Sequence, residues 1–244
     1  MALEGKVAIV TDAGSENGSA IARRFLDEGA DVAVCRGAGV RALPMPDDLP
    51  TAILRLEGDV CVPSEAQRMV DEVLQRFGRV DVLVNHGAGG RLVGTIMDVT
   101  QEDFNEAMTG DVWSVFALSS AVIPVMQKAG RGAIVNISSI GRNGLKNRPL
   151  RSSSQAAVAA LTASMAMDHA EEGIRINGLL LGPTLSKRMP AEQMAELARR
   201  APLGQLHSPD DVAAAALFLA SDESRMVTGA FLPLDAGRSM PSSV

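Results

Sequence analysis

Short apolar runs alternate with longer amphipathic stretches along most of the chain. The apolar runs are bounded by turn residues and indicate buried strands, at 6–12, 30–36, 52–60, 80–90, 132–139, 174–182 and 230–237. Between several of them, apolar residues recur every three to four positions and indicate helices, at 19–29, 64–78, 103–130 and about 152–172. Apolar strands that alternate with helices predict a parallel sheet covered on both faces. We therefore expect residues 1–244 to form a single, doubly wound α/β domain with a parallel sheet of about seven strands.

One stretch departs from this alternation. Residues 37–50 read GAGVRALPMPDDLP and carry three prolines where a helix should connect the second and third strands. Proline lacks the amide that a helix interior needs, so this helix is expected to be short or missing. In such sheets, ligands bind outside the carboxyl ends of the strands, where the strand order reverses. The candidate site therefore lies in the loops that follow the strands.

Composition narrows the class of protein. With 46% hydrophobic and 21% charged residues, the chain has an ordinary globular composition, and a net charge of −6 without a basic tail argues against a nucleic-acid binder. We see no apolar run of membrane-spanning length and no signal peptide after Met1, so we expect no membrane partner and a cytoplasmic location. Cys35 and Cys61 are expected to be reduced, packed thiols. The three histidines lack metal-ligand spacing, and the chain contains no tyrosine.

An ordered series of motifs resembles the short-chain dehydrogenase/reductase family over essentially the whole chain. The motifs are GKVAIVTDAG with Gly18, GDV at 58–60, VDVLVNHGAG, GAIVNISS, AAVAALT, IRINGLLLGP, LGQLHSPDDVA and LFLASDESRMVTGAFLPLDAG. The resemblance implies a Rossmann-like fold, a nicotinamide dinucleotide in the site, and hydride transfer to or from a carbonyl or alcohol.

The first turn departs from the family pattern T-G-x-x-x-G-x-G. Here it reads TDAGSENG, so that Asp12 and Glu16 replace two glycines while Gly18 remains and Gly14 partly restores the turn. The glycines let the backbone approach a pyrophosphate at the helix N-terminus. Each added carboxylate repels a pyrophosphate by roughly 1 kcal/mol at a few ångströms. We therefore expect no dinucleotide, or weakly bound NADP. The alternative interpretation is that Asp12 and Glu16 merely cap the following helix.

Other cofactor positions resemble the family better. Asp59 matches the acidic residue that meets the adenine, and Asn85 matches the first asparagine of the N-N-A-G loop, whose remaining positions are His86, Gly87 and Ala88. Arg36 follows the second strand, where an arginine in the family favours a 2′-phosphate. A solvated charge at a strand end is the alternative for Arg36.

The resemblance also implies a catalytic tetrad of Asn, Ser, Tyr and Lys. These positions fall on Asp111, Ser139, Arg151 and Gln155, with a register uncertain by one residue between Ser139 and Arg151. Arginine does not release its proton near neutral pH, and glutamine does not exchange protons. The general acid and the lysine that lowers its pKa are therefore missing. Asp111 is expected to form an ion pair with Arg151. The alternative is that Asp111 acts as a base whose pKa is raised by burial.

Basic residues gather in the loops expected around the site. They are Arg142, Lys146, Arg148, Arg151, Lys187 and Arg188. A positive field there fits a phosphate- or carboxylate-bearing small molecule. An ordinary solvated loop is the alternative.

The family also implies an oligomer built on the two long helices after the fourth and fifth strands. The second helix is rich in Ala and Ser, which allows close approach, whereas Trp113 and Phe116 of the first fit a core equally well. The segment 229–240 resembles a further contact of family tetramers. We expect a dimer or tetramer with symmetric contacts, with a monomer as the alternative.

Three functions remain open at this point. In the first, the chain is a non-redox subunit of a homo-oligomer, or of a hetero-oligomer with an active relative. In the second, it is an isomerase, lyase or cyclase that uses Ser139, Asp111 and Arg151. In the third, it is a divergent NADP-dependent reductase.

Overall fold

A parallel sheet runs through the middle of the computed structural model, which describes residues 1–36, 43–87, 93–187 and 189–240. The strands lie in the order β3-β2-β1-β4-β5-β6-β7 and pair in parallel throughout. They are β1 (Val7–Val10), β2 (Asp31–Cys35), β3 (Leu54–Leu56), β4 (Val82–His86), β5 (Gly132–Ser139), β6 (Ile174–Leu181) and β7 (Phe231–Leu234). The predicted seven-stranded, doubly wound α/β domain is confirmed.

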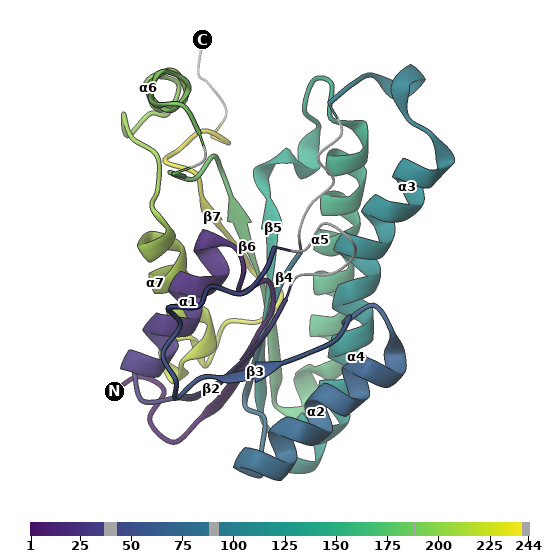
Figure 1. Cartoon of the computed structure of the whole chain (residues 1–244), viewed down its shortest axis with the longest axis vertical. Helices are drawn as coiled ribbons and strands as arrows, with labels where there is room; N and C mark the ends of the chain where they lie inside the picture. The colour runs from purple at the N-terminus through teal and green to yellow at the C-terminus, as the bar shows by residue number, and fades with distance from the viewer. Residues whose placement is uncertain (37–42, 88–92, 188, 241–244) are drawn as a thin grey trace.

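Helices cover both faces of the sheet. Figure 1 shows α1 and α7 on one face and α2, α4 and α5 on the other. The helices are α1 (Glu16–Asp27), α2 (Pro63–Phe77), α3 (Gln101–Met108), α4 (Ser114–Ala129), α5 (Pro149–His169), α6 (Ala191–Arg199) and α7 (Pro209–Ala220). Alternate side chains of each strand enter opposite cores, since Val10 packs with Phe25 of α1 while Ile9 packs with Met69 of α2.

The boundaries differ from the predicted ones in places where local chemistry explains the difference. Helix α5 begins three residues early, at Pro149, because proline is well suited to the first helical position. Helices α6 and α7 were not predicted, although a capping box between Ser208 and Asp211 marks the start of α7. Residues 43–53 contain no helix, as their prolines predict, and residues 37–42 of that segment lie outside the described part of the chain.

A single wide turn joins α3 to α4. The π-helical turn Thr109–Trp113 lies between the two helices and carries Asp111 inward. With this turn, α3 and α4 form one helix, Gln101–Ala129, which is long and apolar enough to cross a membrane by length and composition. No run of that kind was expected from the sequence. Half of its most apolar window is buried inside the domain, as in a core helix of a globular fold. Trp113 and Phe116 are not core residues, because 45% and 48% of their surfaces are exposed.

Candidate functional site

The strand order reverses between β1 and β4. From β1 the chain builds outward through β2 and β3, then returns to β4 on the other side of β1. In sheets of this type, ligands bind where the loops after two such strands diverge, at the carboxyl ends of the strands, and this region is called the β1–β4 crevice below. Two sequence-predicted groups converge here, the first turn and the tetrad positions.

The first turn is built around Ser15 and Gly18. The Ser15 hydroxyl caps α1 by accepting from the Gly18 amide at 3.0 Å, and it donates to the Asp12 carbonyl at 2.8 Å. A Cβ on Gly18 would lie 2.2 Å from that same carbonyl oxygen, so only glycine allows this close packing. The capping interpretation of Asp12 is therefore wrong, because Ser15 supplies the cap.

The Asp12 side chain contacts His86 instead. Asp12 adopts a left-handed backbone with φ of 55°, a conformation that is uncommon outside glycine, asparagine and aspartate, and its side chain is buried. Its Oδ2 lies 3.0 Å from Nδ1 of His86, and the Ser15 Oγ lies 3.3 Å from the same nitrogen. Thr11 fixes the backbone of His86 by donating to its carbonyl at 3.0 Å and accepting from its amide at 2.7 Å. The ends of β1 and β4 are thus held together at this pair.

Glu16 spans from the first turn to the loop after β6. It is the first residue of α1, where a carboxylate favours the helix N-terminus, and its Oε1 also accepts from the Lys187 amide at 3.1 Å. Gly14 is covered from the other side, since a Cβ there would lie 2.3 Å from the Leu43 carbonyl oxygen. A hollow of about 670 Å³ lies beside these residues, between the start of α1, residues 185–187 and the start of α7.

The remaining predicted cofactor residues differ in how they are used. The Asn85 amide is buried and donates to Asn136 at 2.9 Å and to Ser119 at 3.2 Å, so it joins β4 to β5 inside the domain. Asp59 accepts from the Cys61 amide at 2.9 Å after β3. Arg36 is exposed at the end of β2. The roles of Asp59 and Arg36 toward a dinucleotide stay predictions.

The tetrad positions Asp111 and Gln155 come together in the interior. The buried Asp111 Oδ2 accepts from the Ser154 hydroxyl at 2.5 Å and from Nε2 of Gln155 at 3.1 Å. Its Oδ1 lies beside Gly87, where an added Cβ would be 3.1 Å away. Sequence reasoning missed Ser154, because only the fold brings α5 against the turn that carries Asp111.

The other two tetrad positions lie near the start of α5. The buried Ser139 hydroxyl donates to the Leu181 carbonyl at 3.2 Å and accepts from the Gly141 amide at 3.1 Å, so it joins β5 to β6 and caps the following turn. Arg151 is half-buried in the first turn of α5. The ion pair between Asp111 and Arg151 stays a prediction.

The predicted basic surface is only partly described. The Arg142 guanidinium lies over the Phe231 ring, 4.6 Å from its centroid, and this cation–π contact fixes it against β7. Arg188 lies outside the described residues. The anion-binding role of this loop stays a prediction. Within the described ranges, no three His, Cys, Asp or Glu side chains are grouped to hold a metal ion.

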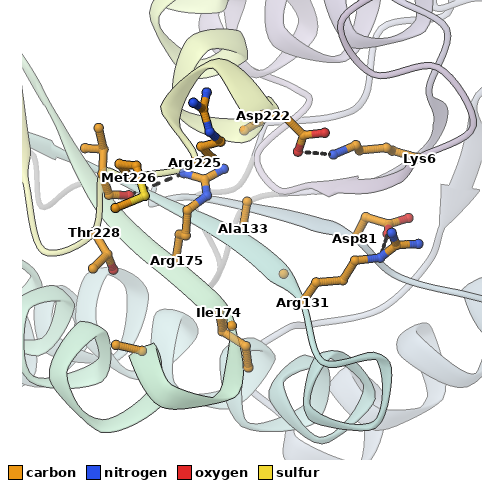
Figure 2. Close-up of a pocket in the computed structure, with 15 residues that line it drawn as sticks. Lys6, Asp81, Arg131, Ala133, Ile174, Arg175, Asp222, Arg225, Met226 and Thr228 are labelled. Carbon is orange, nitrogen blue, oxygen red and sulfur yellow. Dashed lines mark hydrogen bonds and ion pairs between the residues drawn. The ribbon is translucent and has the colours of Figure 1, made fainter.

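A second pocket, of about 380 Å³, lies at the opposite ends of the strands (Figure 2). Lys6 pairs with Asp222 at 2.6 Å, and Arg131 lies 3.8 Å from Asp81. Arg175 donates to the carbonyls of Leu219 and Ser221, both at 3.0 Å, and burial lowers the pKa of its guanidinium. Through these bonds, Arg175 ties β6 to the segment that precedes β7.

Comparison with known proteins decides the family. The family model described as enoyl-(acyl carrier protein) reductase matches residues 16–239. The chain belongs to the short-chain dehydrogenase/reductase family. An uncharacterised oxidoreductase of Thermotoga maritima is 34% identical, with 97% of this chain and 98% of that protein covered.

Two further members of the family bear on function. The BbsC subunit of (2S)-[(R)-hydroxy(phenyl)methyl]succinyl-CoA dehydrogenase from Thauera aromatica is 30% identical, with 96% of this chain and 95% of that protein covered. The ligand-free aldohexose dehydrogenase of Thermoplasma acidophilum superposes with a TM-score of 0.89 at 28% identity, over 99% of this chain and 97% of that one. The chain therefore shares the fold of this dehydrogenase over nearly its whole length.

Proposed function

We propose that this protein is a short-chain dehydrogenase/reductase family member that does not carry out nicotinamide-dependent hydride transfer and that serves as a subunit of an oligomer. The observation that carries the proposal is the contact between Asp12 and His86 in the first turn. This contact places a buried carboxylate and an imidazole where the family pattern has a glycine and an asparagine.

The first turn does not fit a pyrophosphate. The family uses glycines there so that the backbone approaches the phosphates, and positive backbone amides attract them. Here the carboxylates of Asp12 and Glu16 each repel a pyrophosphate by about 1 kcal/mol, and the contact of Glu16 with the Lys187 amide would have to break. The two repulsions together weaken the binding of a dinucleotide by roughly thirtyfold.

The tetrad positions support the same conclusion. The chain contains no tyrosine, and Arg151 keeps its proton near neutral pH. Gln155 hydrogen-bonds to Asp111, and the Ser139 hydroxyl is held by Leu181 and Gly141. No described group at these positions therefore replaces the phenol that protonates a substrate oxygen.

Exposed aromatic side chains support assembly. Trp113 of the π-helical turn and Phe116 of α4 stack with ring centroids 6.3 Å apart, and both side chains are exposed. An exposed apolar patch of this kind is typical of an interface. The name of the Thauera relative describes a subunit, which favours a hetero-oligomer with an active relative, and its coenzyme A thioester substrate suggests an acyl thioester for such a complex.

Titration of nicotinamide fluorescence tests the cofactor proposal. We expect no binding of NADH or NADPH by the native protein below millimolar concentrations. The variant with Asp12→Gly, Glu16→Gly and His86→Asn, which restores the family residues, is expected to gain affinity by at least about tenfold. Arg200→Ala, a charge change at the exposed residue that follows α6, is the control. Micromolar binding by the native protein would contradict the proposal.

Light scattering tests the assembly. We expect the purified chain to run as a dimer or larger, and Trp113→Glu to shift it toward the monomer while its circular dichroism is unchanged. Purification from native cells then separates the homomeric from the heteromeric form. A native protein that is monomeric, with no homologue co-purifying, contradicts the subunit role.

A non-redox enzyme is the second candidate, and one observation favours it. Among the described residues, no group hydrogen-bonds the Nε2 atom of His86, although its Nδ1 lies against a buried carboxylate.

A further inference from the structure

The pair of Asp12 and His86 has the geometry of a general acid–base centre. Nδ1 of His86 lies 3.0 Å from the buried Asp12 carboxylate, and 13% of the His86 side chain is exposed. A carboxylate on Nδ1 selects the tautomer with a proton on that nitrogen and leaves a lone pair on Nε2. The same carboxylate stabilises the imidazolium that forms when Nε2 takes up a proton.

The backbone around the pair is arranged to hold it in place. Thr11 fixes both backbone groups of His86, and Ser15 fixes the Asp12 carbonyl while capping α1. Asp12 also keeps a left-handed backbone, with φ of 55°, that glycine would adopt more easily. Left-handed residues other than glycine are uncommon, and they are found at functional sites where the surrounding structure holds them in place.

The pair also lies where a ligand is expected on general grounds. Asp12 follows β1 by two residues, and His86 ends β4. These strands are neighbours on either side of the reversal in strand order, so the pair borders the crevice in which sheets of this type bind ligands.

We propose that Asp12 and His86 form a proton-transfer dyad, in which Nε2 of His86 exchanges a proton with a carbonyl or hydroxyl compound bound in the β1–β4 crevice. Nε2 takes a proton from the carbon next to the carbonyl, and the C–H electron pair moves into the enolate. The same proton then returns from Nε2 to another atom of that molecule. The reaction is an isomerisation that needs no oxidant, reductant or added group.

Ser15 is not the nucleophile of a triad. Its hydroxyl approaches Nδ1 rather than Nε2, at 3.3 Å, and it already donates to the Asp12 carbonyl and accepts from Gly18. The dyad therefore supports proton transfer and not acyl transfer to serine.

This inference rests on the proposed loss of the dinucleotide, because the dyad and a pyrophosphate occupy the same crevice. Two measurements test it in the full-length protein. The first is long-range ¹H–¹⁵N NMR of histidine-labelled protein, which identifies the tautomer of each ring. We expect His86 to carry its proton on Nδ1 at neutral pH, and we expect Asp12→Asn to change this tautomer.

The second measurement uses p-nitrophenyl acetate as a probe for a reactive Nε2. The nitrogen attacks the acetyl carbon, p-nitrophenolate leaves, and water then converts the acetylimidazole to acetate and free imidazole. We expect His86→Asn and Asp12→Asn each to lower the rate of p-nitrophenolate release by about tenfold or more. Asparagine tolerates the left-handed backbone of residue 12, so Asp12→Asn keeps the turn. His169→Asn, at the far end of α5, is the control and should stay within about twofold.

The outcomes separate this inference from the proposed function. A native rate no higher than that of His86→Asn, or a neutral His86 protonated on Nε2, overturns the dyad and leaves the cofactor proposal untouched. If micromolar NADPH binds and suppresses ester hydrolysis, the proposed loss of the dinucleotide fails while the dyad stands. If either variant does not fold, the other decides, because each removes one partner.

Discussion

Replacing Ser154 by alanine should destabilise the protein, because Asp111 is a buried carboxylate that depends on its donors. The Ser154 hydroxyl is fully buried and donates to Asp111 at 2.5 Å, and Gln155 supplies a second bond at 3.1 Å. A hydrogen bond to a charged group contributes about 2 kcal/mol, and alanine returns about 0.5 kcal/mol through its higher helix propensity. We therefore expect Ser154→Ala to lower the free energy of unfolding by about 1.5 kcal/mol, and Tm by roughly 3–6 °C for a domain of this size.

Ser153 offers a matched control on the same helix. Its hydroxyl is exposed and donates only to the carbonyls of Pro149 and Leu150 within α5, at 2.8 and 3.1 Å. Ser153→Ala should therefore change the free energy of unfolding by less than about 0.5 kcal/mol. Urea titration monitored by circular dichroism measures both variants. In an Asp111→Asn background the effect of Ser154→Ala should shrink by about 1 kcal/mol, because the bond is then between neutral groups.

Equal stability of Ser154→Ala and Ser153→Ala would refute this reasoning. It would mean that the Asp111 carboxylate gains nothing from its buried donor, and that the polar cluster at the tetrad positions does not stabilise the fold. A coupling near zero in the double variant would lead to the same conclusion by an independent measurement.

Three further predictions follow from single positions. Gly18→Ala places a Cβ 2.2 Å from a backbone carbonyl oxygen and should lower the free energy of unfolding by about 1–3 kcal/mol, whereas Gly110→Ala, whose Cβ meets nothing within 4 Å, should leave it unchanged. Equal urea midpoints for the two variants would contradict this prediction. Burial lowers the pKa of His207 in the folded state, so the unfolded state takes up a proton first as the pH falls below about 6.5, and the free energy of unfolding should drop there. The drop should be smaller in His207→Gln, and parallel curves of unfolding free energy against pH for the two proteins would exclude the effect. Burial raises the pKa of Cys35 and Cys61 to about 12, so neither thiol should react with Ellman's reagent at pH 8 until urea is added.

The strand pattern was predictable because both faces of a parallel sheet are buried. Apolar runs such as 174–182 could be assigned as strands without knowing their neighbours, and the observed β6 (Ile174–Leu181) falls inside that run. Helix α7 was missed although Ser208 and Pro209 signal its start, because its alanines carry little amphipathic pattern. Edge strand β3 is only Leu54–Leu56, shorter than predicted, since it pairs on one side alone, with β2.

The candidate site was predictable only where a motif names a position. The resemblance placed Asp111 and Gln155 at tetrad positions, and Nε2 of Gln155 does donate to Oδ2 of Asp111 at 3.1 Å. The contact between Asp12 and His86 was missed, because the two residues lie far apart in the chain and only the order of the strands makes β1 and β4 neighbours. Ser154 was missed for a similar reason, since its partner lies on a turn packed against α5.

The departures at the first turn and at the tetrad meet on two consecutive residues of one loop. His86, at the end of β4, contacts Asp12, and Gly87, the next residue, lies against Oδ1 of Asp111. The two Thr11 hydrogen bonds hold the backbone of His86 to the end of β1, so both groups of departures border one strand end. Restoring the glycines alone would remove the carboxylate from His86 and leave the Asp111 cluster in place. Under the proposed function, dinucleotide binding therefore depends on the first turn and hydride transfer on the tetrad positions, so that restoring both requires separate sets of changes.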